Sequence, residues 1–386
     1  MLNFSKNFWI ISFGLLFFMM SFNLILPELN EFITNMGGAD QKGLIISIFA
    51  ISALISRPFS GKLSDTIGRK KVMYIGLGVA IIVSLLYPLF TSVSLFLSLR
   101  LMHGFSAGFL PTGATAIVTD ILPENKRGAG MGILGVFISI GFGGGQAIGS
   151  IIRTKLGMTN LFITASILGL ISLILILFLK ETLQNKVKFR WKLLKINWND
   201  IIEPSVLPAA IVMFLSTFSS GIVLTITPDM SDFFNIENKG WFLGFYAFST
   251  IFIRIFVSGL SDRIGRPKTL IYGLFIMFIS MIVVTFSNEW KLYTIGAILF
   301  GVSTGISSPT LMAWTADLSH KQRRGIGAST LFIALELGIM FGSASTIFTY
   351  NNTLFSTKYS FIAGSIMAMI GIIYLILHLK YRFSKR

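Results

Sequence analysis

Long apolar runs constrain this chain more than any other feature. A helix that crosses a membrane needs about 20 mostly apolar residues, and the sequence contains twelve such runs. In the first half they lie at 8–27, 43–61, 71–90, 94–118, 129–152 and 159–179. In the second half they lie at 204–228, 241–258, 269–287, 292–316, 326–348 and 359–379. The sequence therefore predicts an all-α membrane protein with twelve transmembrane helices.

Charged residues are scarce and separate the apolar runs. They make up 12% of the chain, against about 25% in an ordinary soluble domain. Lys and Arg number 32 and Asp and Glu number 16, and most of the cations fall in alternate loops. Cations beside a span stay preferentially on the cytoplasmic side, so both termini are predicted to be cytoplasmic, in a multi-pass protein of the cell membrane. Short cationic bursts between spans fit membrane lipids rather than nucleic acid.

Several chemistries have no residues to carry them. The chain has no cysteine, and its three histidines show no metal-ligand spacing. Catalytic sequences such as Gly-x-Ser-x-Gly or His-Glu-x-x-His do not occur. We therefore expect no enzyme activity, no cofactor and no metal.

The two halves of the chain repeat each other. The hydrophilic stretch 181–203 separates a bundle at 1–180 from a second at 204–386, and it is predicted to be either an amphipathic helix on the inner leaflet or a loose linker. An offset of 197 residues places 60–69 on 257–266, Gly104 and Gly108 on Gly301 and Gly305, Asp120 on Asp317, and Arg127-Gly128 on Arg324-Gly325. Two homologous six-helix bundles in parallel arrangement are typical of alternating-access carriers.

Three motifs resemble those of the major facilitator superfamily, and the resemblance covers essentially the whole chain. Residues 61–71, GKLSDTIGRKK, resemble the family's motif in the loop between the second and third spans. Residues 99–104, LRLMHG, resemble the arginine motif of the fourth span in proton-coupled members. Gly132, Gly141, Gly145, Gln146 and Gly149 follow the fifth-span glycine pattern of the drug:proton antiporter branch, with Gln146 in place of its proline.

The resemblance implies a cytoplasmic gate in each repeat. Asp65 should meet the start of the eleventh span near Gly325, and Asp262 should meet the start of the fifth near Gly128. Arg69 would pair with Asp120, and Arg266 with Asp317. Gly61 and Gly68 are predicted to give the first motif the backbone freedom for a tight turn, and Gly265 is the counterpart of Gly68. The alternative is that these are ordinary turn residues and topological cations.

Charged groups inside the predicted spans are candidates for proton coupling. Glu336 lies eleven residues past Gly325, about 16 Å into the membrane, where an ionisable group is a functional hypothesis by default. Arg100 and His103 share a helix face in the fourth span. The alternatives are a structural carboxyl for Glu336, anchoring by carbonyls for Arg100 and a polar lining role for His103. Arg57 and Arg254 are predicted to reach the cytoplasmic interface.

The remaining site residues concern packing and substrate. Gly141, Gly145 and Gly149 recur every fourth residue and should let helices approach closely. By the family resemblance the first, fourth, seventh and tenth spans line a cavity, whose candidate residues are Met20, Asn23, Phe105, Phe109, Thr217, Phe218, Ser219, Ser303, Thr304 and Ser307. Their aromatic and hydroxyl groups favour a neutral or weakly cationic organic substrate.

The sequence thus predicts a monomeric secondary transporter that exchanges protons for a small organic compound. An uptake symporter for a metabolite is a second interpretation, and a membrane sensor that transports nothing is a third.

Overall fold

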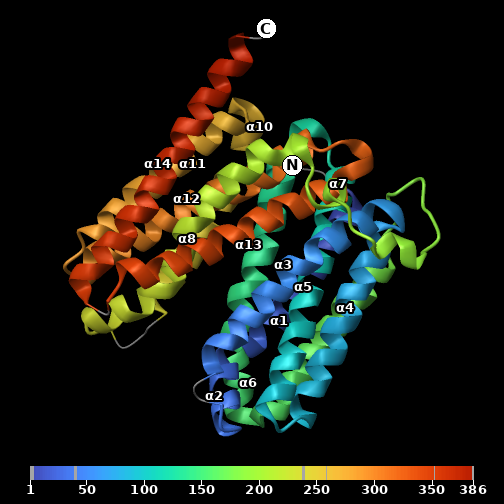
Figure 1. Ribbon diagram of the computed structural model, residues 1–386, viewed down its shortest axis with the longest axis horizontal. Helices are drawn as coiled ribbons and strands as arrows, with labels where there is room; N and C mark the ends of the chain where they lie inside the picture. Colours follow the sequence, from blue (N-terminus) through green and yellow to red (C-terminus); the bar gives the residue numbers. More distant parts are fainter. Residues whose placement is uncertain (1–3, 39–40, 237–239, 258, 352, 385–386) are drawn as a thin grey trace. The chain divides into compact units, whose positions relative to one another are not determined.

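The computed structural model describes residues 4–38, 41–236, 240–257, 259–351 and 353–384, and in this part of the chain all regular structure is helical (Figure 1). The α-helices are α1 (Lys6–Ile25), α2 (Leu29–Asn35), α3 (Lys42–Thr66), α4 (Arg69–Leu86), α5 (Val93–Ile121), α6 (Arg127–Leu177), α7 (Trp198–Ile201), α8 (Leu207–Phe233), α9 (Trp241–Val257), α10 (Leu260–Ile264), α11 (Arg266–Thr285), α12 (Trp290–Leu318), α13 (Arg324–Thr349) and α14 (Leu354–Ser384). Single 3₁₀ turns are η1 (Leu26–Glu28), η3 (Tyr87–Leu89), η4 (Glu124–Lys126), η5 (Trp191–Leu194), η6 (Pro204–Val206) and η7 (Lys321–Arg323).

Ten helical stretches among the described residues are long and apolar enough to cross a membrane. Large apolar side chains such as Ile46 and Phe275 stand exposed on them, as lipid-facing residues do in a membrane. Three of the twelve expected runs are not separate members of these ten. The run at 241–258 is the shorter helix α9, and its last residue, Ser258, lies outside the described residues.

The other two expected runs, 129–152 and 159–179, form the single element α6. Its 51 residues would measure about 77 Å if straight, more than twice the membrane's apolar core. At Gly157 the backbone leaves the helical region, with φ 84° and ψ 172°. Both arms of α6 lie against the same part of α1, because Gly145 abuts Met20 while Ser21 donates to the carbonyl of Ala165 at 2.6 Å. The element is therefore a hairpin with two apolar arms.

The described chain packs into two compact units. Unit 1 comprises 1–122, 137–205 and 319–332, and unit 2 comprises 123–136, 206–318 and 333–386. The first turns of α6 thus belong to unit 2 and the first turns of α13 to unit 1. The two units therefore do not coincide with the predicted bundles 1–180 and 204–386, because each unit takes in residues from both of them. The two sequence-based bundles remain a prediction.

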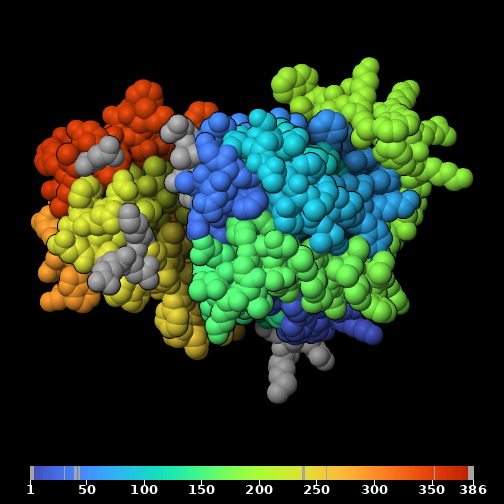
Figure 2. Space-filling model, turned by 90° about the horizontal axis from the view of Figure 1, so that it is seen from below, coloured from blue at the N-terminus to red at the C-terminus, as the bar shows by residue number. Residues whose placement is uncertain are grey.

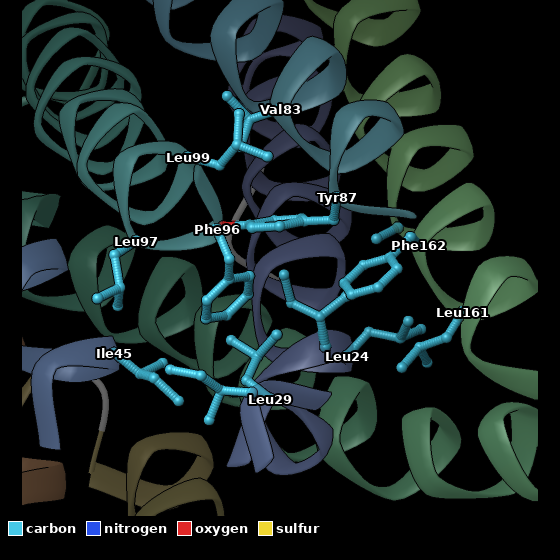
Figure 3. Packing of buried hydrophobic residues seen from close by; sticks show 13 residues of the cluster. Leu24, Leu29, Ile45, Val83, Tyr87, Phe96, Leu97, Leu99, Leu161 and Phe162 are labelled. Carbon is cyan, nitrogen blue, oxygen red and sulfur yellow. The ribbon is translucent and has the colours of Figure 1, made fainter. Parts of the chain in front are cut away.

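Unit 1 has an aromatic core beside α1. Tyr87 stacks on Phe162 with ring centroids 5.0 Å apart and lies 5.5 Å from Phe96. Leu24 and Leu29 pack against the same rings (Figure 3). This cluster draws on α1, α2, α3, η3, α5 and the second arm of α6, so it ties the helices of the unit together.

In each unit one glycine, at equivalent positions of the two repeats, brings two helices into close contact. In unit 1 a Cβ on Gly104 would lie 2.2 Å from the carbonyl oxygen of Phe49, so α5 meets α3 backbone to backbone. In unit 2 a Cβ on Gly301 would lie 2.5 Å from the carbonyl oxygen of Tyr246, so α12 meets α9 in the same way. Close approach at small residues is the usual means of helix association in membranes, and here it recurs at the 197-residue offset.

The central linker contains two short helical pieces, η5 and α7, and no long helix. Figure 2 shows its yellow-green side chains standing out from the unit that carries it. Glu203 at its end is 2% exposed; it accepts a hydrogen bond from Ser205 and pairs with Arg323 of η7. The linker therefore belongs to the packing of unit 1.

Candidate functional site

Asp65 at the end of α3 binds the first turn of α13 within unit 1. Its two carboxylate oxygens accept hydrogen bonds from the backbone N–H groups of Gly325 at 2.7 Å and Ile326 at 2.8 Å. The first N–H groups of a helix have no partner inside the helix, and a negative charge there is favoured by the helix dipole. The Asp65 side chain is 5% exposed, so water competes little for these bonds.

Asp262 repeats this arrangement on the first turn of α6 within unit 2. Its carboxylate accepts from the backbone N–H groups of Gly128 at 2.8 Å and Ala129 at 2.9 Å. A side chain at Gly128 would collide with Ser261 and Arg266. The glycine at this position therefore keeps room for the carboxylate.

An arginine from the next helix completes each site. In unit 1 Arg69 Nε lies 2.7 Å from Asp120 Oδ2 and Arg69 Nη1 lies 3.4 Å from Asp65. In unit 2 Arg266 Nε lies 2.8 Å from Asp317 and its Nη1 binds Asp262. Both guanidinium groups are at most 9% exposed. Each thus bridges a carboxylate on a helix start to a carboxylate at the end of the fourth span of its repeat.

A second arginine in each unit was not among the predicted gate residues. Arg324 binds Asp120 in unit 1, and Arg127 Nη1 lies 2.8 Å from Asp317 in unit 2. These two residues are equivalent at the 197-residue offset. The sequence repeat could have indicated these two arginines, because Asp120 and Asp317, their carboxylate partners, are also 197 residues apart.

The motif at 61–71 differs from its predicted form. Helix α3 continues to Thr66 and α4 begins at Arg69, so Ile67 and Gly68 alone form the turn. Gly68 has the positive φ of 124° that favours glycine, and its counterpart Gly265 has 91°. Gly61 is helical, and the prediction that it serves the turn is wrong. A Cβ there would lie 2.8 Å from Cβ of Ser329, so Gly61 lets α3 approach α13.

The start of α4 is capped from the linker. Glu181 accepts hydrogen bonds from the backbone N–H groups of Arg69 at 3.3 Å and Lys70 at 3.2 Å. Thr182 beside it donates to Asp120. Helix α11 in unit 2 has Pro267 in its first turn instead, which removes one of the N–H groups that needs a cap. The linker therefore adds to the gate network of unit 1 a contact specific to that repeat.

Arg57 and Arg254 are buried, and the prediction that they reach the interface is wrong. Arg57 is 4% exposed, donates to the carbonyl of Gly108 at 3.4 Å and lies 4.5 Å from the ring centre of Phe332. Arg254 donates to the carbonyl of Gly135 at 2.6 Å. Phe332 and Gly135 are themselves equivalent positions. Carbonyl and ring partners inside each unit hold the two cations.

Arg100 and His103 share a partner that the sequence did not indicate. The Tyr87 hydroxyl lies 3.1 Å from His103 Nδ1 and 3.5 Å from Arg100 Nη1. Arg100 also donates to the carbonyl of Ile45 at 3.2 Å and lies 4.7 Å from the ring centre of Phe49. All three polar side chains are buried. They form one polar cluster inside the apolar core of unit 1.

Glu336 lies in α13, half-buried, within unit 2. It is on the same helix as Gly325 and Ile326, which bind Asp65. Glu336 lies about 16 Å along this helix from Gly325.

The fifth-span glycines pack α6 against α1. A Cβ on Gly141, Gly145 or Gly149 would lie 2.1 to 2.7 Å from a backbone oxygen of α1. Gly132 borders a small cavity beside Arg254 in unit 2, and Gln146 is half-buried. Gly338 and Gly342, equivalent to Gly141 and Gly145, pack α13 against Phe214 and Phe218 of α8. The sequence contained this second set, and the offset of 197 residues would have found it.

The candidate cavity residues divide by exposure. Met20, Phe105, Thr217 and Thr304 keep part of their surface exposed. Ser219 and Ser303 donate to the carbonyls of Gly364 and Gly273 inside unit 2, so their hydroxyls serve helix packing. Four further candidates are buried, namely Asn23, Phe109, Phe218 and Ser307.

Comparison with known proteins agrees with this architecture. The Major Facilitator Superfamily model matches residues 11–237 and 209–386. The Quinolone resistance protein NorA of Staphylococcus aureus (strain COL) is 25% identical over 305 residues, which cover 77% of this chain and 78% of that protein. The Multi-drug resistance efflux pump PmrA of Streptococcus pneumoniae serotype 4 is 27% identical over 380 residues, which cover 92% of this chain and 94% of that protein.

Two solved structures share the fold. The human organic anion transporter MFSD10 superposes with a TM-score of 0.80 at 20% identity, over 96% of this chain and all of that one. The proton:xylose symporter XylE superposes with a TM-score of 0.79 at 14% identity, over 97% of this chain and 95% of that one.

Proposed function

This chain belongs to the Major Facilitator Superfamily, a family of membrane transporters and not of enzymes, and from that membership we propose that it is a proton-coupled exporter of small organic compounds. Relatives that cover most of its length are named for quinolone resistance and multi-drug efflux. The observation that carries a gated mechanism is the duplicated contact of a buried carboxylate with the start of a helix, Asp65 on α13 and Asp262 on α6.

The proposed gate works through the strength of these contacts. Each carboxylate stabilises two helix N–H groups and is held by an arginine, as Asp65 is by Arg69. A carboxylate at a helix start contributes about 0.3–1 kcal/mol, and up to about 2 kcal/mol when partly buried. Alternating access requires the contacts to break and reform in each cycle. Two contacts of this free energy can stabilise one conformation of the transporter and are still weak enough to break in each cycle.

The proposed energy source is the proton gradient, with Glu336 as the group that takes and releases the proton. It lies within a candidate span, where ionisable groups mark ion pathways. Arg100 and His103 are proposed to assist from unit 1, linked by Tyr87. Helix α5 carries both of them and also Asp120 of the gate, so the polar cluster and the gate share one helix.

The proposed substrate is a neutral or weakly cationic organic molecule. The candidate residues that retain exposed surface, Met20, Phe105, Thr217 and Thr304, carry no fixed charge. Met20 and Phe105 offer a thioether and an aromatic ring, while the hydroxyls of the two threonines also donate to backbone carbonyls of their own helices. Apolar walls with a few polar groups are typical of sites for drug-sized molecules. Membrane lipid and protons are the other expected partners, and the transporter is proposed to act as a monomer.

The test is a measurement of proton movement in proteoliposomes while a panel of organic compounds is added. Wild type is compared with Glu336→Gln and with Glu289→Gln, a matched change at an exposed side chain. Proton movement opposite to compound movement, lost in Glu336→Gln and retained in Glu289→Gln, is the expected result. Movement in the same direction would identify an uptake symporter instead. No compound movement at all would favour the sensor interpretation.

A further inference from the structure

The linker between Gln184 and Lys195 presents cations and aromatic rings and contains no acidic residue. Lys186, Lys188, Arg190 and Lys192 alternate with Val187, Phe189 and Trp191. No helix covers 186–190, and Arg190 has extended backbone angles, φ −137° and ψ 142°. Because successive side chains of an extended chain point to opposite sides, Lys188 and Arg190 are expected on one side and Val187 and Phe189 on the other. Trp191 and Lys192 follow in the 3₁₀ turn η5.

Its apolar side chains are left in contact with the surroundings of the protein. Trp191 is 81% exposed, and Val187 and Phe189 are about half exposed. The rings of Phe189 and Trp191 lie 5.7 Å apart, edge to face. Exposed rings next to exposed cations cost free energy in water and are favoured at the boundary between lipid headgroups and hydrocarbon.

Contacts within unit 1 hold the segment at the end of a membrane span. The Val187 N–H donates to the carbonyl of Thr66 at 3.0 Å, and Thr66 is the last residue of the candidate span 44–66. Leu193 and Leu194 pack on the small apolar cluster that includes Leu63 and Ile67. The linker therefore lies beside the end of a candidate membrane span.

The three carboxylates of the linker 181–203 lie outside this segment, and each contacts another part of the protein. Glu181 caps α4, Asp200 Oδ2 lies 2.8 Å from Lys62 Nζ, and Glu203 pairs with Arg323. Each cation near an anionic membrane surface contributes about 1 kcal/mol of attraction. The excess of positive charge over 184–195 is therefore complementary to acidic headgroups.

From these observations we propose that residues 186–192 are a docking surface for anionic phospholipids, with the Val187, Phe189 and Trp191 side chains among the lipid headgroups and the cations beside phosphates. The proposal depends on the membrane location of the chain and not on transport. A soluble acidic protein is an occupant that the experiment distinguishes, because it would leave these side chains in water.

The test uses the full chain in lipid nanodiscs. Because the protein has no cysteine, a nitroxide on Val187→Cys reports from one position, and its collisions with oxygen and with a water-soluble nickel complex measure its depth. Discs of phosphatidylcholine are compared with discs that contain phosphatidylglycerol. We expect the label to lie deeper when phosphatidylglycerol is present. A label that stays in water in both compositions would overturn the proposal.

A charge variant identifies the cations that bind. Lys188, Arg190 and Lys192 are exposed, so changing all three to Gln should leave folding intact, which thermal unfolding verifies. The variant should weaken the preference for phosphatidylglycerol about 10- to 100-fold. Its matched control changes the exposed cations Arg263, Lys268 and Lys321 to Gln and should retain the preference. Equal losses in both variants would show that net charge, and not this segment, attracts the lipid.

Discussion

Asp65 and Asp262 show how one side chain can control the start of a helix. Each binds two successive N–H groups at 2.7 to 2.9 Å, a pairing that depends on charge as well as on geometry. Their arginine neighbours Arg69 and Arg266 are nearly fully buried. Removal of one carboxylate leaves such a guanidinium with fewer partners, and a buried cation is costly when it loses its partner.

Asp65→Asn should reduce transport about 5- to 30-fold, since one or two kcal/mol of gate stability is that factor in a conformational equilibrium. The amide still accepts a hydrogen bond but lacks the charge that favours the start of α13. Initial transport rates in proteoliposomes measure the effect. The control Glu289→Gln removes an exposed carboxylate and should transport normally. Wild-type rates in Asp65→Asn would rule out the proposed gate.

The lowered pKa of Asp200 determines how the contact between Asp200 and Lys62 depends on pH. Burial raises the pKa of Asp200, but hydrogen bonds from Lys62 and the Asn197 backbone, with the charges of Lys62 and Arg323, outweigh it and hold the pKa below its usual value. A lowered folded-state pKa gives stability that is present at neutral pH and is lost as pH falls through that pKa. The contact should therefore persist throughout the physiological range.

Asp200→Asn should lower stability by up to about 1 kcal/mol, as expected for a pair near the surface. The difference in unfolding temperature from wild type should stay constant from neutral to mildly acidic pH and should close only in strong acid. Thermal unfolding across a pH series measures it. A difference that already disappears at mildly acidic pH would contradict the lowered pKa.

Helices in each unit associate through glycines placed against backbone. On α6 Gly141, Gly145 and Gly149 face α1, and on α13 Gly338 and Gly342 face α8. The four-residue spacing predicted one helix face, while the partner helix of each set appears only in the folded units. Gly61 shows the limit of such patterns: its sequence context resembles a turn, yet helical packing against Ser329 explains it.

Gly145→Ala should destabilise the protein by about 1–3 kcal/mol, because the new Cβ would lie 2.7 Å from the carbonyl oxygen of Met20. A backbone oxygen cannot move aside as a flexible side chain can. Gly143→Ala is the matched control on the same helix, where a Cβ meets nothing within 4 Å. Thermal unfolding in detergent compares the two, and equal stability would refute close packing at Gly145.

For the whole molecule, we propose twelve spans with both termini in the cytoplasm. The ten apolar helices, the second arm of α6 beyond Gly157 and the shorter helix α9 supply that number among the described residues. The two arms of α6 both flank α1, as two antiparallel passes would. Orientation rests on the distribution of cations and not on packing.

Cysteine labelling in intact cells tests this topology, because the chain has no cysteine of its own. A membrane-impermeant maleimide should label Lys155→Cys, near the Gly157 turn of α6, and should leave Asn125→Cys unlabelled until the cells are opened. Both positions are exposed. Labelling of Asn125→Cys in intact cells would reverse the proposed orientation.

The sequence by itself determined the membrane class, the internal repeat and the family, because hydropathy over 20 residues and matches at a fixed offset are properties of the linear chain. It also identified Asp65, Asp262 and their arginines as a set. It did not indicate that Tyr87 joins Arg100 to His103, that Glu181 caps α4, or that Arg57 and Arg254 are buried. Those contacts join residues far apart in the chain, and only the tertiary structure decides them, since the partner of a polar group depends on which helix end or carbonyl the packing places beside it.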